Sequence, residues 1–199
     1  SSMMQCLADG YFILPQTIGD YLHDIYQDKV SVEDPAFAAT ERIVADRISR
    51  LMSIQGTRTP MSLHEELGRT MWDHCGMARN AKGLQTAIGH IQELKKTFWS
   101  DLRIPGTDKG PNQALERAGR LADFLELGEL MCRDALHRDE SCGCHLREEH
   151  QTDDGEVIRN DEKFGNVSVW EWKGDDQPHA LHEEQLEFDA LPLMTRSYK

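Results

Sequence analysis

Six side chains that can bind metal ions lie within nineteen residues: Cys132, His137, Cys142, Cys144, His145 and His150. Zinc takes Cys thiolates and His imidazoles in tetrahedral sets, so a zinc site is the first chemistry to consider. Structural zinc sites favour ligand pairs with about two to four residues between them, whereas only one residue lies between Cys142 and Cys144. The spacing therefore predicts no metal, and free thiols beside a turn are expected, with a reactive thiol or a transient disulfide as the alternative.

Composition and charge narrow the class of protein. The 199 residues include 5 Cys in no regular framework, which favours reduced thiols in a cytoplasmic setting. The formal net charge is −13, and from Asp139 onward 16 acidic residues face 6 basic ones. Because nucleic-acid binding normally requires a basic face, nucleic acid is not an expected partner. We interpret the acidic residues as a solvated surface, with a docking patch for a basic partner as the alternative.

Hydropathy gives no sign of a membrane or export segment. The sequence has neither an apolar run of ~20 residues nor a basic and then apolar leader. Its length is sufficient to bury a substantial core, as one domain or as one domain with an appendage.

The first predicted helix covers residues 3–26. One face carries an apolar side chain about every three or four residues: Leu7, Tyr11, Leu14, Ile18, Leu22 and Ile25. Pro15 lies inside this pattern, and proline removes a backbone donor and clashes with the preceding turn. We therefore expect the helix to be kinked or split at Pro15.

Caps and apolar periodicity predict four further helices, at about 35–54, 60–76, 81–98 and 112–137. Asp34, Thr59 and Asn80 are the expected caps, and the first two precede a proline, which favours the first helical position. The apolar stripes have the width of core-facing helices, so we interpret them as scaffold and not as a cofactor-binding surface. The predicted fold is mainly α, an up-down bundle with a three-helix core and bracing helices.

A short β or extended tail is expected after Arg147. Residues 167–172 alternate with period two, which predicts a strand, and residues 185–188 are a candidate second strand. Asp154 and Gly155 have the composition of a hairpin turn. Because two isolated strands are marginal in water, the tail must lean on the bundle, and Trp170 and Trp172 are the expected anchors.

Four short motifs, taken in order, resemble one known family. Residues 1–3 are Ser-Ser-Met, and residues 71–80 hold a Gly and an Arg at a helix junction. Residues 112–130 contain Leu-Glu-Leu near their end, at 125–127. After the last helix, a signature is kept by Glu140, Ser141, Gly143, His145, Arg147 and Glu148, while Cys142 replaces its middle Arg. Together these motifs resemble the C-terminal part of the flavoprotein subunit of succinate dehydrogenase and fumarate reductase.

The resemblance implies an FAD-dependent oxidoreductase of electron transport and the tricarboxylic acid cycle, which interconverts succinate and fumarate. It implies an iron-sulfur subunit and a membrane cytochrome b subunit as partners, at the cytoplasmic face of the inner membrane. It places the catalytic residues and most of the dicarboxylate site outside residues 1–199. The alternative hypothesis is an independent helical interaction module, with zinc binding as an option.

The sequence lacks the Gly-rich strand-turn-helix motif that holds a dinucleotide pyrophosphate, and it begins within a helical pattern. We therefore expect a fragment that is inactive alone and binds no FAD tightly. Three parts are expected. Residues 1–30 are the terminal helix of a missing flavin domain, residues 31–140 the helical bundle, and residues 141–199 the acidic tail. The apolar face of the helix at 3–26 would then lack its partner, and a dimer through this face would cover it.

The resemblance also suggests roles for particular residues. The backbone amides of Ser2 and Met3 would face the flavin ring at a helix N-terminus, with fraying of these first residues as the alternative. Glu140, Ser141, His145 and Arg147 are candidates for an interface with the cofactor domain. Alternatively, His145 and Arg147 tie the tail to the last helix.

Overall fold

The computed structural model describes residues 2–25, 30–174, 177–190 and 192–194. The contacts between residues divide the chain into two compact units, residues 1–46 and residues 47–199. Among the described residues, no helix has the length and apolar character needed to cross a membrane. The predicted mainly α fold is confirmed.

The first unit contains a helical segment that changes type along its length. It consists of α1 (Ser2–Ala8), the π-helical η1 (Asp9–Ile13) and α2 (Leu14–Asp24). Pro15 lies in the first turn of α2, directly after the π-helical stretch. The backbone stays helical from Ser2 to Asp24, so the helix is not split at Pro15, and a kink there stays a prediction. Tyr11, Ile18 and Leu22 are each more than half exposed, so the unit itself does not cover its apolar face.

Helix α3 (Pro35–Ser53) passes from the first unit into the second. Its predicted start is confirmed, because the Asp34 carboxylate accepts a hydrogen bond from the Ala36 amide at 2.9 Å. In the second unit Leu51 joins the core, and the Arg50 guanidinium lies 3.8 Å from the centre of the Trp99 ring. Only this last part of α3 therefore braces the bundle.

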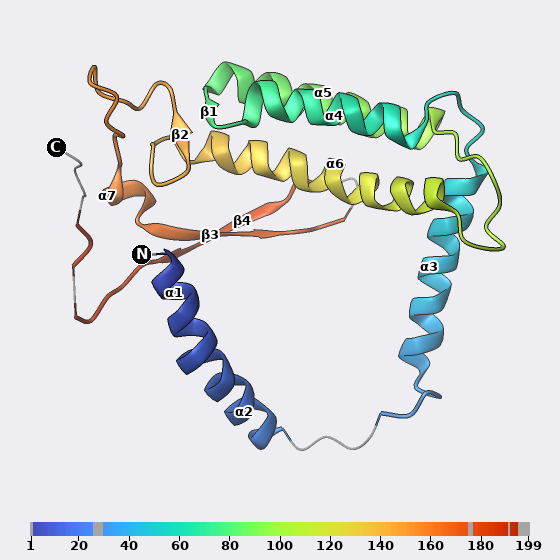
Figure 1. The fold of residues 1–199 in the computed structure, drawn as a ribbon, viewed down its shortest axis with the longest axis horizontal. Helices are drawn as coiled ribbons and strands as arrows, with labels where there is room; N and C mark the ends of the chain where they lie inside the picture. The colour runs from blue at the N-terminus through green and yellow to red at the C-terminus, as the bar shows by residue number, and fades with distance from the viewer. Residues whose placement is uncertain (1, 26–29, 175–176, 191, 195–199) are drawn as a thin grey trace. The chain divides into compact units, whose positions relative to one another are not determined.

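The bundle is built from α4 (Pro60–Cys75), α5 (Ala81–Asp101) and α6 (Gln113–His137), which lie side by side in Figure 1. Each helix begins at a side-chain cap, and those of α4 and α5 were predicted from the sequence. Thr59 accepts a hydrogen bond from the Ser62 amide, Asn80 from the Gly83 amide, and Asn112 from two amides at the start of α6. Such caps each stabilise a helix by about 1 kcal/mol.

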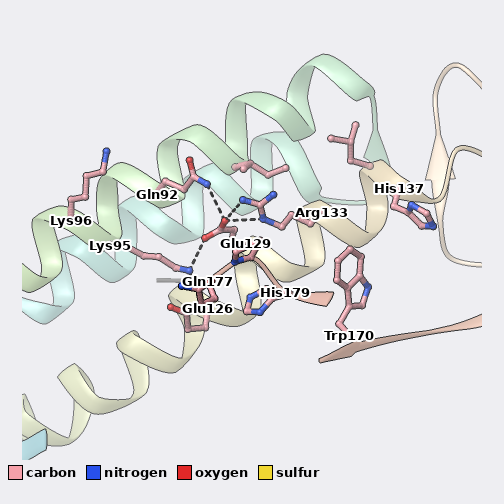
Figure 2. A pocket seen from close by; sticks show the side chains of 13 residues that line it. Gln92, Lys95, Lys96, Glu126, Glu129, Arg133, His137, Trp170, Gln177 and His179 are labelled. Carbon is pink, nitrogen blue, oxygen red and sulfur yellow. Dashed lines mark hydrogen bonds and ion pairs between the residues drawn. The ribbon is translucent and has the colours of Figure 1, made fainter. Parts of the chain in front are cut away.

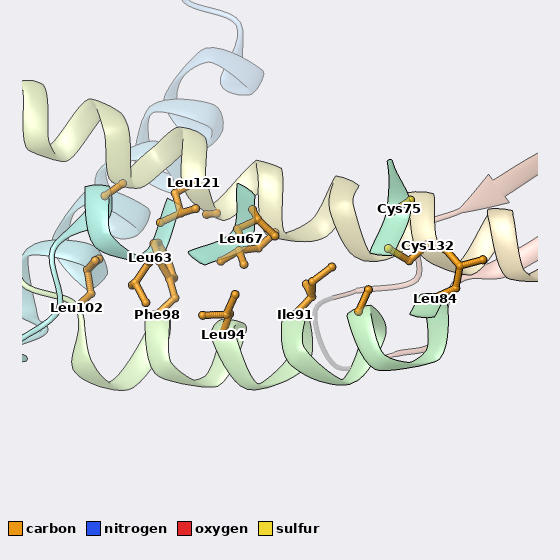
Figure 3. Packing of buried hydrophobic residues seen from close by; sticks show 14 of the residues in the cluster. Leu63, Leu67, Cys75, Leu84, Ile91, Leu94, Phe98, Leu102, Leu121 and Cys132 are labelled. Atoms are coloured by element: carbon orange, nitrogen blue, oxygen red, sulfur yellow. The ribbon is translucent and has the colours of Figure 1, made fainter. Parts of the chain in front are cut away.

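One apolar core runs between these three helices (Figure 3). The members that are 5% exposed or less include Leu63, Leu67, Leu84, Ile91, Leu94, Phe98, Leu121 and Leu125. Burying each such side chain contributes about 1.5–3 kcal/mol, so packing and not helix propensity holds the bundle together. The apolar stripes thus face the core, as predicted, and a scaffold role stays a prediction.

Two small sheets and a short helix follow the bundle. Strand β1 (Ala78–Arg79), between α4 and α5, pairs in parallel with β2 (Leu146–Arg147), which follows α6. After α7 (Asp161–Phe164), β3 (Asn166–Glu171) pairs antiparallel with β4 (Ala180–Gln185). The β1–β2 pair was not expected from the sequence, because two residues are too few to show a periodicity.

The tail differs from the prediction in two respects. The second strand ends at Gln185, so a strand over residues 185–188 is wrong; the cross-strand register with β3 places it earlier. Trp170 is an anchor, since its indole N–H donates to the Asp134 carboxylate at 2.7 Å. Trp172 is not, because it lies beyond the last residue of β3 and is 62% exposed.

Candidate functional site

Residues 138–150 fold back over the C-terminal end of α6. Cys142 and His145 exchange backbone hydrogen bonds of 2.9 and 3.0 Å, which closes a two-residue hairpin turn. Gly143 takes the first central position with φ +58°, a conformation that other residues rarely adopt. The Ser141 hydroxyl accepts from the Arg147 amide at 2.8 Å and donates to the Arg147 carbonyl at 3.0 Å. Ser141 therefore holds the two ends of the turn together.

Arg147 is the centre of this arrangement, with its side chain 2% exposed. Its Nη1 donates to the carbonyls of Ala135 and Leu136 at 3.0 and 3.4 Å. These carbonyls lie in the last turn of α6, where they have no partner within the helix and the helix dipole favours a cation. Asp139 and Glu149 each lie 3.3 Å from the guanidinium. A buried charge is tolerated here because carbonyl acceptors and carboxylates surround it.

His145 joins the turn to the junction between α4 and α5. Its Nδ1 lies 3.3 Å from Nη1 of Arg79, and its Nε2 lies 2.8 Å from the Arg138 carbonyl. A guanidinium only donates and a carbonyl only accepts, so Nε2 carries the hydrogen and the ring is neutral. Burial, followed by the charges of Arg79, Arg147 and Arg138, lowers the pKa of His145, although its bond to the Arg138 carbonyl opposes this. The ring therefore acts as a neutral hydrogen-bonding bridge.

Glu140 connects α6 with α7. Its carboxylate is 2% exposed, and it accepts from Arg138 at 3.0 Å and from the Asn160 amide at 2.6 Å. Arg138 also donates to the carbonyls of Phe164 and Asn166 at 3.2 and 3.1 Å. The pair thus fixes the segment that leads into β3.

The acidic residues after Arg147 accept hydrogen bonds from the start of α5. Glu148 accepts from the Asn80 side chain at 2.7 Å, and Glu149 accepts from the Ala81 amide at 2.5 Å. Burial raises the pKa of Glu149, but the Ala81 amide and Arg147 outweigh it and hold the pKa below its ordinary value. Anions are stabilised at a helix N-terminus, so Glu148 and Glu149 complete the cap of α5.

The structure thus brings Glu140, Ser141, His145 and Arg147 together, with bonds to α6, α7 and the α4–α5 junction. These bonds tie the tail to the last helix, which is one of the two predicted roles. A role at an interface with another domain stays a prediction. Sequence reasoning missed both partners of Glu140: Arg138, two residues before it, and Asn160, which no sequence pattern links to it.

The other predicted site residues lie in the first unit. Ser2 and Met3 begin α1, and the Met3 side chain is 78% exposed; the Ser2 side chain and all of Ser1 lie outside the described residues. Their role toward a flavin stays a prediction.

The metal-binding side chains that gather in the sequence are separated in the structure. Cys132 is buried in the core, His137 lies 3.2 Å from Glu183, and His150 lies 2.8 Å from Asp139. All five Cys are free thiols, with Cys142 half-buried and Cys144 exposed. Within the part of the chain that the structure describes, no three or more His, Cys, Asp or Glu side chains could hold a metal ion together.

Comparison with known proteins gives these contacts a context. A family model described as fumarate reductase flavoprotein C-term matches residues 64–198. The chain belongs to this family. The family match includes Glu140, Ser141, His145 and Arg147, whereas Ser2 and Met3 precede it.

Named relatives agree with the family. The fumarate reductase flavoprotein subunit of Proteus vulgaris is 29% identical over 138 residues, 69% of this chain and 22% of that protein. The subunit of the same name from Escherichia coli (strain K12) is 27% identical over 165 residues, 83% of this chain and 26% of that protein. The succinate dehydrogenase flavoprotein subunit of Bacillus subtilis is 24% identical over 164 residues, 82% of this chain and 27% of that protein. The chain spans about a quarter of the length of these relatives.

Solved structures share the fold. A variant of E. coli quinol fumarate reductase FrdA superposes with a TM-score of 0.70 and 26% identity, over 82% of this chain and 27% of that one. The apo Mycobacterium smegmatis Sdh1 complex contains a chain of the same fold, with a TM-score of 0.66 and 24% identity, over 85% of this chain and 27% of that one.

Proposed function

We propose that this chain is the C-terminal part of a flavoprotein subunit that interconverts succinate and fumarate with FAD. The match of the fumarate reductase flavoprotein family to residues 64–198 carries the proposal. The role of the helices and tail is that of a scaffold and an interaction surface. Catalytic residues and most of the dicarboxylate site belong to the remainder of the polypeptide.

The partners follow from the same proposal. The whole protein passes electrons between FAD and an iron-sulfur subunit, which connects to a membrane cytochrome b subunit. It lies at the cytoplasmic face of the inner membrane as a peripheral component. A related structure supports this arrangement, since it is a quinol-fumarate reductase with menaquinol.

Exposed apolar side chains in both units support a larger assembly. In the first unit, Tyr11 and Phe12 are 74% and 70% exposed; in the second, Trp72 and Met77 at the α4–α5 junction are 83% and 91% exposed. Side chains of this size are normally covered when they gather on a surface. The proposed remainder of the subunit would cover them, as would a second copy of this chain in its absence.

The residues of this chain do not hold FAD by themselves. No Gly-rich phosphate-binding turn occurs in the sequence, and the flavin-facing role proposed for Ser2 and Met3 involves only two backbone amides. Their helix N-terminus would favour the negative charge of a reduced flavin, while the other ligands come from elsewhere. Glu140, Ser141, His145 and Arg147 would keep the adjoining surface rigid at the domain interface.

The test compares two polypeptides made from the same gene. The 199 residues alone are expected to show neither a flavin absorption spectrum nor succinate oxidation. A longer product that includes any sequence encoded before Ser1 is expected to purify with FAD and to reduce an artificial electron acceptor with succinate. A longer product without flavin, or a reading frame that starts at Ser1, would favour the independent interaction module instead.

A further inference from the structure

A cavity of about 620 Å³ lies on the side of the bundle formed by α5 and α6. Residues of β3 and of the segment 177–179 complete its wall (Figure 2). Sites for small molecules have volumes of about 300–1,000 Å³, so its size is suited to one. None of the four residues at the turn after α6, which the proposed function uses, lines it.

A buried carboxylate fixes the polar side of the cavity. The Glu129 side chain is 8% exposed, and three side chains donate to it: Lys95 at 2.6 Å, Arg133 at 2.6 and 2.9 Å, and Gln92 at 3.1 Å. Figure 2 shows these three converging on Glu129. Burial raises the pKa of Glu129, but the hydrogen bonds outweigh it and hold the pKa below its ordinary value. Glu129 therefore stays ionised and orients Lys95 and Arg133.

Hydrogen-bond donors remain unused on this side. Arg133 donates to Glu129 through Nε and Nη2, which leaves Nη1 without a hydrogen-bond partner among the described residues. Lys95 has three N–H groups and uses two, on Glu126 and Glu129. The side chains of Gln177 and His179 also line the cavity and have no hydrogen bond within the described part of the chain. The lining thus offers more free donors than free acceptors.

Charged groups of both signs line the cavity. Three cations, Lys95, Lys96 and Arg133, face two carboxylates, Glu126 and Glu129. Lys96 is also paired with Glu93 at 2.6 Å, so the charges of the lining and this partner balance, whereas the whole chain has a formal net charge of −13. A small anion would find here cations with unused donors already in place.

Part of the lining is apolar and aromatic. Ile88, Leu136 and Pro178 line it together with the indole of Trp170. The indole is held by its hydrogen bond to Asp134 and by the edge of the His137 ring, whose centre is 6.3 Å away. A ring fixed in this way offers a surface on which a flat apolar group can stack.

We propose that this cavity binds a small organic carboxylate with a flat apolar body. The carboxylate takes the free N–H groups of Arg133 and Lys95, and the flat body packs between Trp170 and the aliphatic side chains. The site does not depend on flavin chemistry, so its test can fail without affecting the proposed function.

The test uses the whole 199-residue chain with ¹⁵N labelling. The probes are 2-naphthoate and its neutral analogue 2-naphthalenemethanol, and the readout is the indole N–H signal of Trp170, assigned with the variant Trp170→Phe. We expect a saturable shift with 2-naphthoate and binding of the neutral analogue at least about tenfold weaker, because charge-assisted hydrogen bonds are roughly twice as strong as neutral ones. The absence of a saturable shift, or equal affinities, would overturn the proposal.

Variants separate this site from general stickiness of the apolar surfaces. Arg133→Gln is expected to reduce the preference for the carboxylate to about threefold or less. Arg120→Gln is the matched control on the same helix, because Arg120 pairs with Glu116 on the surface, and it is expected to leave the preference unchanged. Lys96→Gln removes a charge at a 72% exposed position without touching Glu129 and is expected to weaken only 2-naphthoate, by about twofold to threefold.

If the Arg133→Gln protein does not fold, the Lys96→Gln variant is the test. An unchanged preference in that variant, or a folded Arg133→Gln protein that keeps the full preference, would refute the site. The proposal would also be refuted if the cavity bound neither probe and instead received an acidic side chain of a partner protein.

Discussion

Replacing Arg147 with Met tests whether the turn after α6 is held by one buried cation. The guanidinium donates to two carbonyls in the last turn of α6 and pairs with Asp139 and Glu149. A hydrogen bond to a charged group contributes about 1.5–3 kcal/mol, and such contributions do not simply add. The two carboxylates are 57% and 40% exposed, so water can replace the lost cation. The larger cost of about 3–5 kcal/mol for an orphaned buried charge therefore does not apply.

We accordingly expect Arg147→Met to lower the free energy of unfolding by about 2–3 kcal/mol, a large part of the roughly 5–15 kcal/mol of a typical domain. Arg147→Lys keeps the charge but loses the planar fork, so we expect about half of that loss. Urea unfolding followed by far-ultraviolet circular dichroism measures both. Arg120→Met is the matched control, and its exposed pair with Glu116 is expected to contribute less than about 0.5 kcal/mol. If Arg147→Met were as stable as this control, the turn would be held by its backbone bonds and not by Arg147.

Three further predictions concern the cap of α5, the neutral histidine and the anchor of the tail. Asn80→Ala should cost about 1–2 kcal/mol in urea unfolding, because α5 loses its cap and the contact with Glu148; a cost below about 0.3 kcal/mol would contradict the cap. The pKa of His145 is lowered in the folded state. The stability that the neutral His145 ring contributes is therefore fully present above its unfolded pKa of about 6.5 and is lost as the pH falls through its folded pKa. Unfolding at pH 7.5 and 5.5 should therefore show a smaller loss in His145→Gln than in the wild type, and equal losses would refute the neutral ring. Trp170→Phe should cost about 1 kcal/mol or more and Trp172→Phe less than about 0.5 kcal/mol, and the reverse order would place the anchor at the wrong indole.

The helices could be predicted from the sequence because their signals are local. Thr59, Asn80 and Asn112 each cap a helix through an amide two or three residues further on, so the cap and its partner are read in one short stretch. The apolar stripe of α5 likewise predicts which side chains enter the core. By contrast, the end of β4 was misplaced, because register depends on the partner strand and not on the strand's own pattern.

The candidate site was found in sequence as a motif, without its partners. The spacing from Glu140 to Arg147 marks a turn, but Arg79 and Asn160 are contributed by distant segments. The prediction that Trp172 anchors the tail failed for the same reason. Alternation places Trp170 and Trp172 on one side of a strand, and only the position of the bundle decides which of them it covers.

The sequence by itself determined the family, the helical fold and the limits of the main helices, because these depend on local caps, apolar periodicity and motifs in order. Only the tertiary structure decided that Arg147 caps the C-terminal end of α6, that His145 is neutral between Arg79 and Arg138, and that a cavity with excess donors forms beside Glu129. Hydrogen-bond satisfaction, burial and the pKa values that follow from them depend on which distant atoms surround a group, and the chain specifies those neighbours only when it folds.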